Sequence, residues 1–362
     1  MTLRILHIDC GREWRGGQRQ ALLLAVGQRE RGSEPLVAGQ PASPLVQRAR
    51  ASGVAVAAVR MRGVWDVAAV GRLRALIRTW RPDVVHAHDA RAHTLAIAAL
   101  LRRAGDIPLV VTRRAPLDRR VIGVRYGRRV ARFIAISRAV RDSMIECGVR
   151  DDRVEVVYAG VPTARVEAPR DWRAECRWPQ DAVVCGVVGP LTGERAATLE
   201  AVAHALPDGV RASTRLLLLG GGSTGPCEVG GLTAFGAGHV DAMADAMAGL
   251  DLLWHPARAE GLGTVIVDAM ALGVPPVCFG VGALPELIEH ERTGLVVPAH
   301  DVAAFAAAAS RLIADARLRR HMADAGPARA ANFESARTVA QVERIYLALL
   351  AATSPAERGT IA

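Results

Sequence analysis

Short apolar runs alternate with longer amphipathic stretches along most of the chain. This alternation is typical of parallel sheets covered by helices, so the predicted fold class is α/β. In the first half, strands are expected at 4–8, 54–59, 83–86, 109–112, 133–136 and 154–157, and helices at 18–31, 67–80, 93–103 and 138–147. In the second half, strands are expected at 182–188, 215–219, 252–255, 277–279 and 294–297, and helices from 264, at 301–314 and at 340–351.

The length of 362 residues suits two α/β domains better than one core. A stretch rich in Pro, Arg and Trp interrupts the periodic pattern after residue 162. We therefore expect an N-terminal domain over 1–165, a linker over 166–180 and a C-terminal domain over 181–339, with a last helix, 340–353, joining the first domain.

Charge is distributed unevenly between the two halves. Residues 1–165 hold 30 arginines against 14 acidic residues, whereas residues 166–362 hold 16 against 22, and the chain has no lysine. A basic half suggests a polyanionic partner: nucleic acid, an anionic membrane surface or a phosphorylated substrate. Nucleic acid is disfavoured, because no recognition motif is present and aromatic residues make up only 4%.

Much of this basic charge lies between Arg113 and Arg132, where apolar residues such as Val130 and Phe133 are interleaved with the arginines. That pattern is expected of a surface that touches anionic lipid, and a solvated helix face explains it equally well. The six cysteines show no C-x-x-C spacing, and the N-terminus reads as a strand rather than a signal peptide. We expect a cytoplasmic protein with reduced thiols, or one peripheral on the inner face of the membrane.

The segment from Glu260 to Gly273 carries the strongest functional signal. Gly261 and Gly263 let the backbone approach a ligand closely, and a helix that begins at Thr264 would attract a diphosphate with its free amides. The carboxylates of Glu260 and Asp268 on either side are suited to accept hydrogen bonds from sugar hydroxyls. The alternative is an ordinary strand-loop-helix with a solvated Glu and a helical Asp.

This segment resembles the E-x7-E signature of retaining glycosyltransferases of family 4 type, which have the GT-B fold. Further elements of that family are matched in order by Ile134-Ala-Ile-Ser137, Val156-Val-Tyr-Ala-Gly-Val161, Gly282-Ala-Leu-Pro-Glu286 and Gly294-Leu-Val-Val-Pro298. The resemblance implies two Rossmann-like domains that face each other across a cleft. It also implies metal-independent sugar transfer from a nucleoside diphosphate sugar, with retention of configuration and no cofactor besides this donor substrate.

Matched by position, Glu260 would lie beside the donor sugar and Asp268 would replace the glutamate that binds the ribose diol. Asp268 keeps the charge but is one methylene shorter. The resemblance places four backbone amides near the sugar and diphosphate: those of Gly261, Leu262, Gly263 and Thr264.

A second match, Val188-Gly189-Pro190-Leu-Thr-Gly-Glu-Arg195, is similar to the family's V-G-R-L-x-x-E-K-G clamp on the donor diphosphate. Gly189 is kept, Pro190 stands where the family has Arg, and Arg195 stands where it has Lys. Arg195 can still pair with phosphate, although a solvated helix-start residue is the alternative.

Two loops of the first half complete the predicted site. Gly16 and Gly17 at a helix start suggest an anion or acceptor site, against the alternative of a plain turn, and the resemblance implies a loop that closes over donor and acceptor. The His86-Ala-His88 pair puts two imidazoles on one face of a strand, and metal binding is one function of such a pair. No third ligand is near in sequence, so no metal is predicted, and the resemblance implies that His88 reaches the donor sugar while His86 packs.

The predicted function is therefore a retaining glycosyltransferase whose acceptor is lipid-linked or an anionic cell-envelope glycan. The predicted catalytic residues are His88, Glu260 and Arg195, and the predicted donor-binding residues are Gly16, Gly17, Gly189, Arg195, Gly261, Leu262, Gly263, Thr264 and Asp268. Pro190 and Asp268 support an alternative, a weak or inactive relative that binds a nucleotide sugar or glycan as a sensor or scaffold. A GT-B epimerase acting on the nucleotide sugar itself is a third hypothesis.

Overall fold

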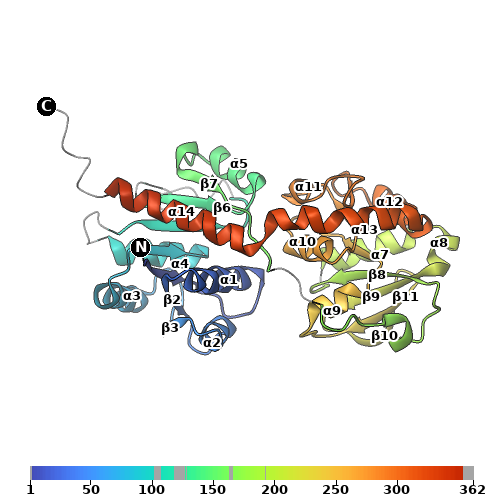
Figure 1. Cartoon of the computed structure of the whole chain (residues 1–362), viewed down its shortest axis with the longest axis horizontal. Helices are drawn as coiled ribbons and strands as arrows, with labels where there is room; N and C mark the ends of the chain where they lie inside the picture. Colours follow the sequence, from blue (N-terminus) through green and yellow to red (C-terminus); the bar gives the residue numbers. More distant parts are fainter. Residues whose placement is uncertain are drawn as a thin grey trace. The chain divides into compact units, whose positions relative to one another are not determined.

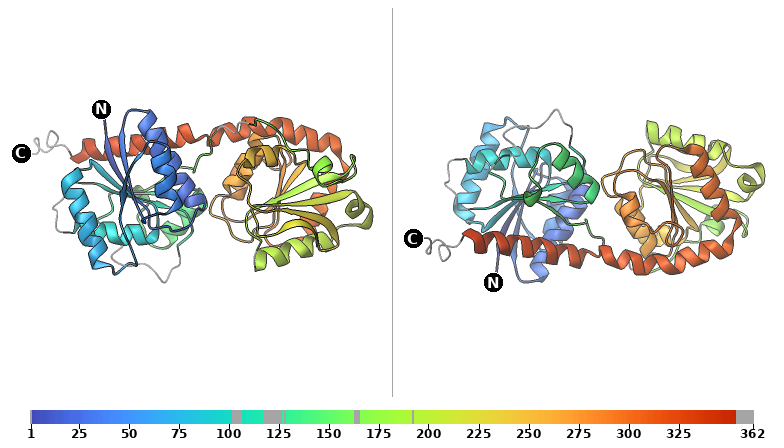
Figure 2. Two further views of the ribbon diagram at one scale, coloured as in Figure 1. Left: turned by 90° about the horizontal axis from the view of Figure 1, so that it is seen from below. Right: turned by 90° about the horizontal axis from the view of Figure 1, so that it is seen from above.

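The structure, a computed structural model, describes residues 2–101, 107–117, 127, 129–162, 166–191 and 193–353 (Figure 1). The chain divides into two compact units, one formed by Met1–Pro162 together with Ser335–Ala362 and the other by Thr163–Glu334. Each unit contains a seven-stranded sheet with helices on both faces (Figure 2). The predicted α/β class is confirmed.

In the first unit the strands are parallel and lie in the order β3-β2-β1-β4-β5-β6-β7. They are β1 (Arg4–Ile8), β2 (Glu34–Gly39), β3 (Ala55–Ala58), β4 (Val84–Ala87), β5 (Leu109–Arg113), β6 (Arg132–Ala135) and β7 (Val154–Val156). The helices are α1 (Gly16–Glu30), α2 (Pro44–Ala51), α3 (Val67–Trp80), α4 (Ala90–Leu100), α5 (Arg138–Glu146) and α14 (Ser335–Thr353), with a 3-10 turn at Asp151–Arg153. The strand order reverses between β1 and β4, and ligands bind beyond the carboxyl ends of strands at such a point.

Two elements of this unit were missing from the prediction. The short strand β2 and the helix α2 fill residues 34–51, and Ser43 caps α2 by accepting a hydrogen bond from the amide of Val46. Helix α4 begins at Ala90, three residues earlier than predicted, because the Asp89 side chain accepts hydrogen bonds from the amides of Arg91 and Ala92. Side-chain caps of this kind set helix starts that apolar periodicity alone misplaces.

In the second unit the strand order is β10-β11-β9-β8-β12-β13-β14. The strands are β8 (Val183–Val188), β9 (Thr214–Leu219), β10 (Thr224–Val229), β11 (Leu232–Ala237), β12 (Leu252–His255), β13 (Pro276–Phe279) and β14 (Leu295–Val297). The helices are α6 (Trp172–Glu175), α7 (Glu194–His204), α8 (Asp208–Ser213), α9 (Met243–Ala248), α10 (Thr264–Ala271), α11 (Leu284–Leu287), α12 (Val302–Ala314) and α13 (Ala316–Ala330), with a 3-10 turn at Ala331–Phe333. The strand order reverses between β8 and β12. Only β10 runs antiparallel, in an edge hairpin with β11 that the prediction missed.

The stretch expected to be a linker, 166–180, differs from the prediction. Helix α6 lies within it, and Trp172 is 1% exposed and donates from its indole nitrogen to the carbonyl of Ala246. Arg173 forms an ion pair with Asp251. This aperiodic stretch is therefore anchored into the second unit by an aromatic side chain and an ion pair.

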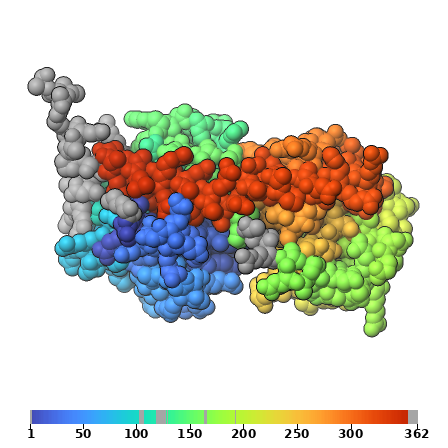
Figure 3. Space-filling view, viewed as in Figure 1, coloured from blue at the N-terminus to red at the C-terminus, as the bar shows by residue number. Residues whose placement is uncertain are grey.

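The last helix, α14, belongs to the first unit and begins at Ser335, five residues earlier than expected. Its atoms are the red ones that lie over one face of that unit, across the blue and green atoms, in Figure 3. Val339, Val342 and Tyr346 are buried in the same apolar cluster as residues of β1 and β4. Gly27 of α1 permits the close approach, because a Cβ there would lie 2.6 Å from a methyl group of Val339.

All six cysteines are free thiols, as predicted. Among the described residues, none of the helices combines the length and the apolarity needed to cross a membrane.

Candidate functional site

In the second unit, the loops that follow the neighbouring strands β8 and β12 carry the predicted donor residues. Glu260 turns its carboxylate back toward β12, where one oxygen lies 3.1 Å from Nε2 of His255 and the other accepts the amide of Gly261 at 2.9 Å. Burial alone would raise the pKa of Glu260, but the hydrogen bond and charge of His255 and the amides of Gly261 and Leu262 outweigh it and lower the pKa. The site therefore holds Glu260 as a carboxylate.

Helix α10 begins at Thr264, as predicted, and Gly263 precedes it with a φ of +82° and no side-chain cap. A Cβ at Gly263 would lie 2.5 Å from a methyl group of Leu284, so this position requires glycine for its backbone angle and for space. The first amides of an α-helix have no partner within the helix. Because the amides of Gly261 and Leu262 face Glu260, the amides at the start of α10 itself are the ones suited to an anion.

Arg195, at the start of α7, donates to the carbonyl oxygens of Val188 at 2.8 Å and Pro190 at 3.3 Å. Gly189 has a φ of +98°, and a Cβ there would lie 3.1 Å from the guanidinium. Burial lowers the pKa of Arg195, and the charge of Glu260 acts in the opposite direction. The predicted cation and the predicted carboxylate thus lie in the loops that follow two neighbouring strands, β8 and β12.

An ion pair joins the same two loops, with 2.8 Å between Nε of Arg258 and a carboxylate oxygen of Glu194. Asp268 lies on α10 one turn beyond Thr264 and is partly exposed, which places it on the same side of the helix. Pro190 is exposed in the β8–α7 loop. The loop therefore presents Arg195 where the related pattern has two cations.

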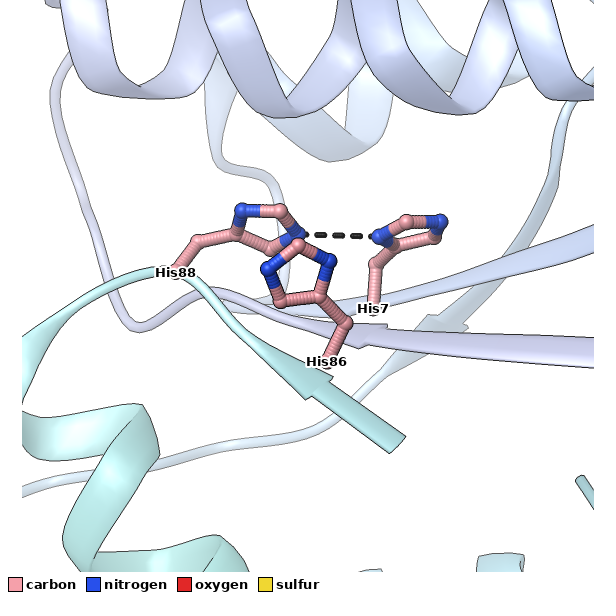
Figure 4. A group of neighbouring side chains, drawn as sticks. All are labelled: His7, His86 and His88. Atoms are coloured by element: carbon pink, nitrogen blue, oxygen red, sulfur yellow. Dashed lines mark hydrogen bonds between the residues drawn. The ribbon is translucent and has the colours of Figure 1, made fainter. Parts of the chain in front are cut away.

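In the first unit, three histidine side chains meet at the point where the strand order reverses (Figure 4). His7 of β1 is the direct neighbour of His86 on β4, and His88 follows β4. No third ligand lies near the His86–His88 pair in sequence, but the structure brings His7 to this pair from 79 residues before His86. One ring nitrogen of each lies within 4.8 Å of the others.

Hydrogen bonds determine the proton positions in this cluster. Arginine only donates, so Nδ1 of His88, 3.2 Å from Arg114, is an acceptor. Nε2 of His88 then carries the proton and donates to Nδ1 of His7 at 2.9 Å. Nε2 of His7 in turn donates to the side-chain oxygen of Gln28 at 2.8 Å.

His86 is held separately, by the hydroxyls of Tyr346 at 2.5 Å and Thr112 at 2.7 Å. All six ring nitrogens therefore have a protein partner, and the cluster is satisfied without an ion. Burial lowers the pKa of all three histidines, that of His7 to about 4. The expectation that the protein uses no metal stays a prediction.

Arg114 occupies the position between this cluster and the predicted glycine loop. It also donates to the carbonyl of His88 at 2.9 Å, and its guanidinium lies 3.3 Å from the place of a Cβ on Gly17. Gly16 is the first residue of α1. His88 is 2% exposed, so contact between its ring and a sugar requires one of its hydrogen bonds to break.

Sequence reasoning missed His255, which holds Glu260, and it placed Arg114 in a basic surface. The structure contradicts that placement, since Arg114 points toward His88, and Val130 and Phe133 have no exposed surface. Residues 118–126 and 128 of the proposed membrane-facing region lie outside the described residues. A histidine on the first strand, beside a strand with two more, is the signal that could have revealed the cluster.

Two α/β units, each with its candidate residues at the point where the strand order reverses, define the GT-B class of glycosyltransferase fold. In agreement, the crystal structure of Anabaena HepE in complex with UDP-glucose superimposes with a TM-score of 0.81 at 21% identity, over 96% of this chain and 100% of that one.

The chain belongs to the family 4, group 1 glycosyltransferases: "Glycosyltransferase Family 4" matches residues 14–165, and "Glycosyl transferases group 1" matches residues 182–315.

Three curated relatives are similar over most of the chain. A D-inositol 3-phosphate glycosyltransferase of Streptomyces bingchenggensis is 28% identical over 78% of this chain and 64% of its own length. A 2-deoxystreptamine N-acetyl-D-glucosaminyltransferase of Streptomyces fradiae is 28% identical over 89% of this chain and 90% of its own length. A glycogen synthase of Mycobacterium tuberculosis is 31% identical over 75% of this chain and 70% of its own length. The chain thus spans less than two thirds of the first of these relatives.

Proposed function

We propose that this protein transfers a sugar from a nucleoside diphosphate sugar to an acceptor, with retention of anomeric configuration. One observation carries the proposal: Arg195 and Glu260 lie in two neighbouring loops, which the Arg258–Glu194 ion pair joins, and the uncapped start of α10 follows directly. A cation and helix-start amides suit the departing diphosphate, whose charge stabilisation is a major part of catalysis. A buried carboxylate suits sugar hydroxyls.

The roles follow from this arrangement. Arg195 and the amides of Gly263 and Thr264 hold the diphosphate, Glu260 orients the sugar, and Asp268 binds the ribose. His88 has both ring nitrogens engaged, which favours a positioning role through Arg114 over direct contact with the sugar. HepE is titled as a complex with UDP-glucose, so UDP-sugars are the first donors to test.

The test is transfer or hydrolysis of UDP-sugars by the wild type and by Glu260→Gln and Arg195→Gln. Loss of one group that stabilises the transition state is expected to lower kcat by about 100-fold or more. Glu228→Gln, on the exposed face of β10, removes the same charge elsewhere in the second unit and should leave the rate unchanged. The anomer of the product, read by NMR, tests retention, and an inverted product contradicts that part of the proposal.

The positioning role of His88 has its own test. If His88 acts through Arg114, then His88→Gln and Arg114→Gln lower kcat/KM by similar factors, and the double variant is no worse than either. Additive losses would instead indicate that His88 has an independent role.

Pro190 and Asp268 favour a second candidate, a weak or inactive relative that binds a nucleotide sugar as a sensor or scaffold. Binding of UDP-sugars without turnover, by a folded wild type, would support it. Product analysis without acceptor separates both from an epimerase.

We also propose that the acceptor is lipid-linked or an anionic cell-envelope glycan, and that arginines of the region 113–132 other than the inward-pointing Arg114 contact an anionic membrane. Only part of that region is described, and its support is the excess of arginine. Equal binding to anionic and neutral vesicles at low salt would exclude the membrane contact.

A further inference from the structure

We propose that a basic pocket in the first unit binds a phosphate or carboxylate group of the acceptor, an inference that rests on the proposed function. The pocket has a volume of about 410 Å³ and lies where the strands β1, β2 and β3 end. Three arginines from two loops line it, together with the turn 40–43: Arg12 after β1, and Arg60 and Arg62 after β3. Ligand pockets commonly measure about 300–1,000 Å³.

Buried hydrogen bonds fix the backbone between two of the arginines, Arg60 and Arg62. The side-chain amide of Gln40 forms two hydrogen bonds with the backbone of Met61, whose amide donates to Oε1 at 3.1 Å and whose carbonyl accepts from Nε2. Met61 has no exposed surface, and its sulfur lies 3.4 Å from the thiol of Cys10. Because Met61 is anchored inward, Arg60 and Arg62 on either side of it are both exposed at the pocket.

The acidic side chains of these loops have partners other than the guanidinium groups of the three pocket arginines. Glu13 pairs with Arg15 at 2.5 Å. Asp66 accepts the amides of Arg62 and Ala69, and these two hydrogen bonds, with the charges of nearby arginines, lower its pKa. Among the described residues, no carboxylate lies within 4 Å of the guanidinium of the three pocket arginines.

This arrangement selects the charge of the ligand. A guanidinium binds phosphate or carboxylate through two parallel hydrogen bonds, and three arginines without a directly paired carboxylate repel an amine. The capped start of α2 at Ser43 adds the positive end of a helix dipole to the same pocket.

Two of the relatives named above have acceptors of opposite charge in their names: D-inositol 3-phosphate, a phosphate ester, and 2-deoxystreptamine, an amine. The pocket favours the first kind. Because the pocket belongs wholly to the first unit and Arg195 and Glu260 to the second, we assign it to the acceptor rather than to the donor diphosphate.

The experiment measures binding of D-inositol 3-phosphate, inorganic phosphate and uncharged inositol by calorimetry, with and without saturating UDP. We expect the two phosphates to bind, inositol to bind at least about 10-fold more weakly, and UDP to leave phosphate binding unchanged. Arg12→Gln, Arg60→Gln and Arg62→Gln should each weaken phosphate binding by about 10- to 100-fold, as expected for loss of a charge-assisted hydrogen bond. Arg78→Gln, on the exposed face of α3, removes the same charge outside the pocket and should change nothing.

Three results would overturn the proposal: phosphate affinity equal in the pocket variants and Arg78→Gln, displacement of phosphate by UDP, or tighter binding of an amine such as 2-deoxystreptamine. Phosphatidylglycerol vesicles that compete with soluble phosphate would assign the pocket to lipid headgroups and reject the acceptor. If phosphate binds through the arginines but no sugar is transferred, the proposed function fails and the anion site stands. If Glu260→Gln stops turnover while the pocket variants retain full phosphate affinity, only the pocket assignment fails.

Discussion

Acid should destabilise the first unit through its buried histidines, and His7 allows the size of the effect to be worked out. His7 is neutral in the folded state because its pKa is lowered to about 4 by burial, whereas an unfolded chain has a histidine pKa of about 6.5. Between these values the unfolded state binds a proton that the folded state does not. Stability is therefore fully present above pH 6.5 and falls as the pH drops toward 4.

The magnitude follows from proton linkage. At pH 5 the protonation of His7 in the unfolded chain removes about 2 kcal/mol, and below pH 4 the loss reaches about 3 kcal/mol. The pKa values of His86 and His88 are lowered as well, so they add to the loss with the same sign. For a unit of this size, 2 kcal/mol corresponds to a fall in Tm of about 4–8 °C.

The assay is urea unfolding at pH 8 and pH 5, followed by hydrogen exchange of peptides from β1 and β4, which report the first unit alone. His7→Gln should lose about 2 kcal/mol less than the wild type between the two pH values. His239→Gln, whose imidazole is 78% exposed in the second unit, serves as the control. An equal loss in the wild type and His7→Gln would refute the assignment of His7 as a neutral buried side chain.

Further predictions concern single substitutions. Tyr346→Phe removes a hydroxyl from His86 and should lower the free energy of unfolding of the first unit by about 1–3 kcal/mol in urea. Gly263→Ala forces a side chain onto a backbone with φ of +82°. It should destabilise the second unit and weaken UDP binding, both measured by thermal shift. Gly209→Ala, at a position with open space around it, should have neither effect. Asp268→Glu restores the longer carboxylate and should tighten UDP-glucose binding in calorimetry by several-fold, up to about 10-fold for one charged hydrogen bond; weaker binding would contradict the assigned ribose contact.

Periodic patterns predicted most of the fold. Helix α3 and strand β12 have the predicted bounds, because their apolar positions repeat without interruption between clear stop signals. Strand β2 was missed because its six residues begin with Glu-Pro and end with Gly, which reads as a turn. The hairpin β10–β11 was missed for a similar reason, since glycines flank and interrupt both strands.

The candidate site was predicted less completely than the fold. Motif spacing identified Glu260 and Arg195, which lie in the loops after the neighbouring strands β12 and β8. It could not reveal that His255 holds Glu260, or that His7 completes a cluster with His88, because those contacts depend on the packing of strands and helices. The buried side chain of Trp172 was assigned to a linker, because a single buried residue does not produce a repeating pattern of apolar positions in the sequence.

Helix α14 has a consequence for how the protein is made. The second unit is one continuous stretch, whereas the core of the first unit lacks Val339, Val342 and Tyr346 until residue 346 has left the ribosome. While the second unit is being synthesised, the apolar face of the N-terminal sheet that α14 will cover is therefore still exposed. Domains usually fold in the order of their synthesis, but here the first unit cannot complete its core until the second unit has been synthesised. A chain truncated before α14 should therefore leave apolar residues of the first unit exposed to chaperones and proteases.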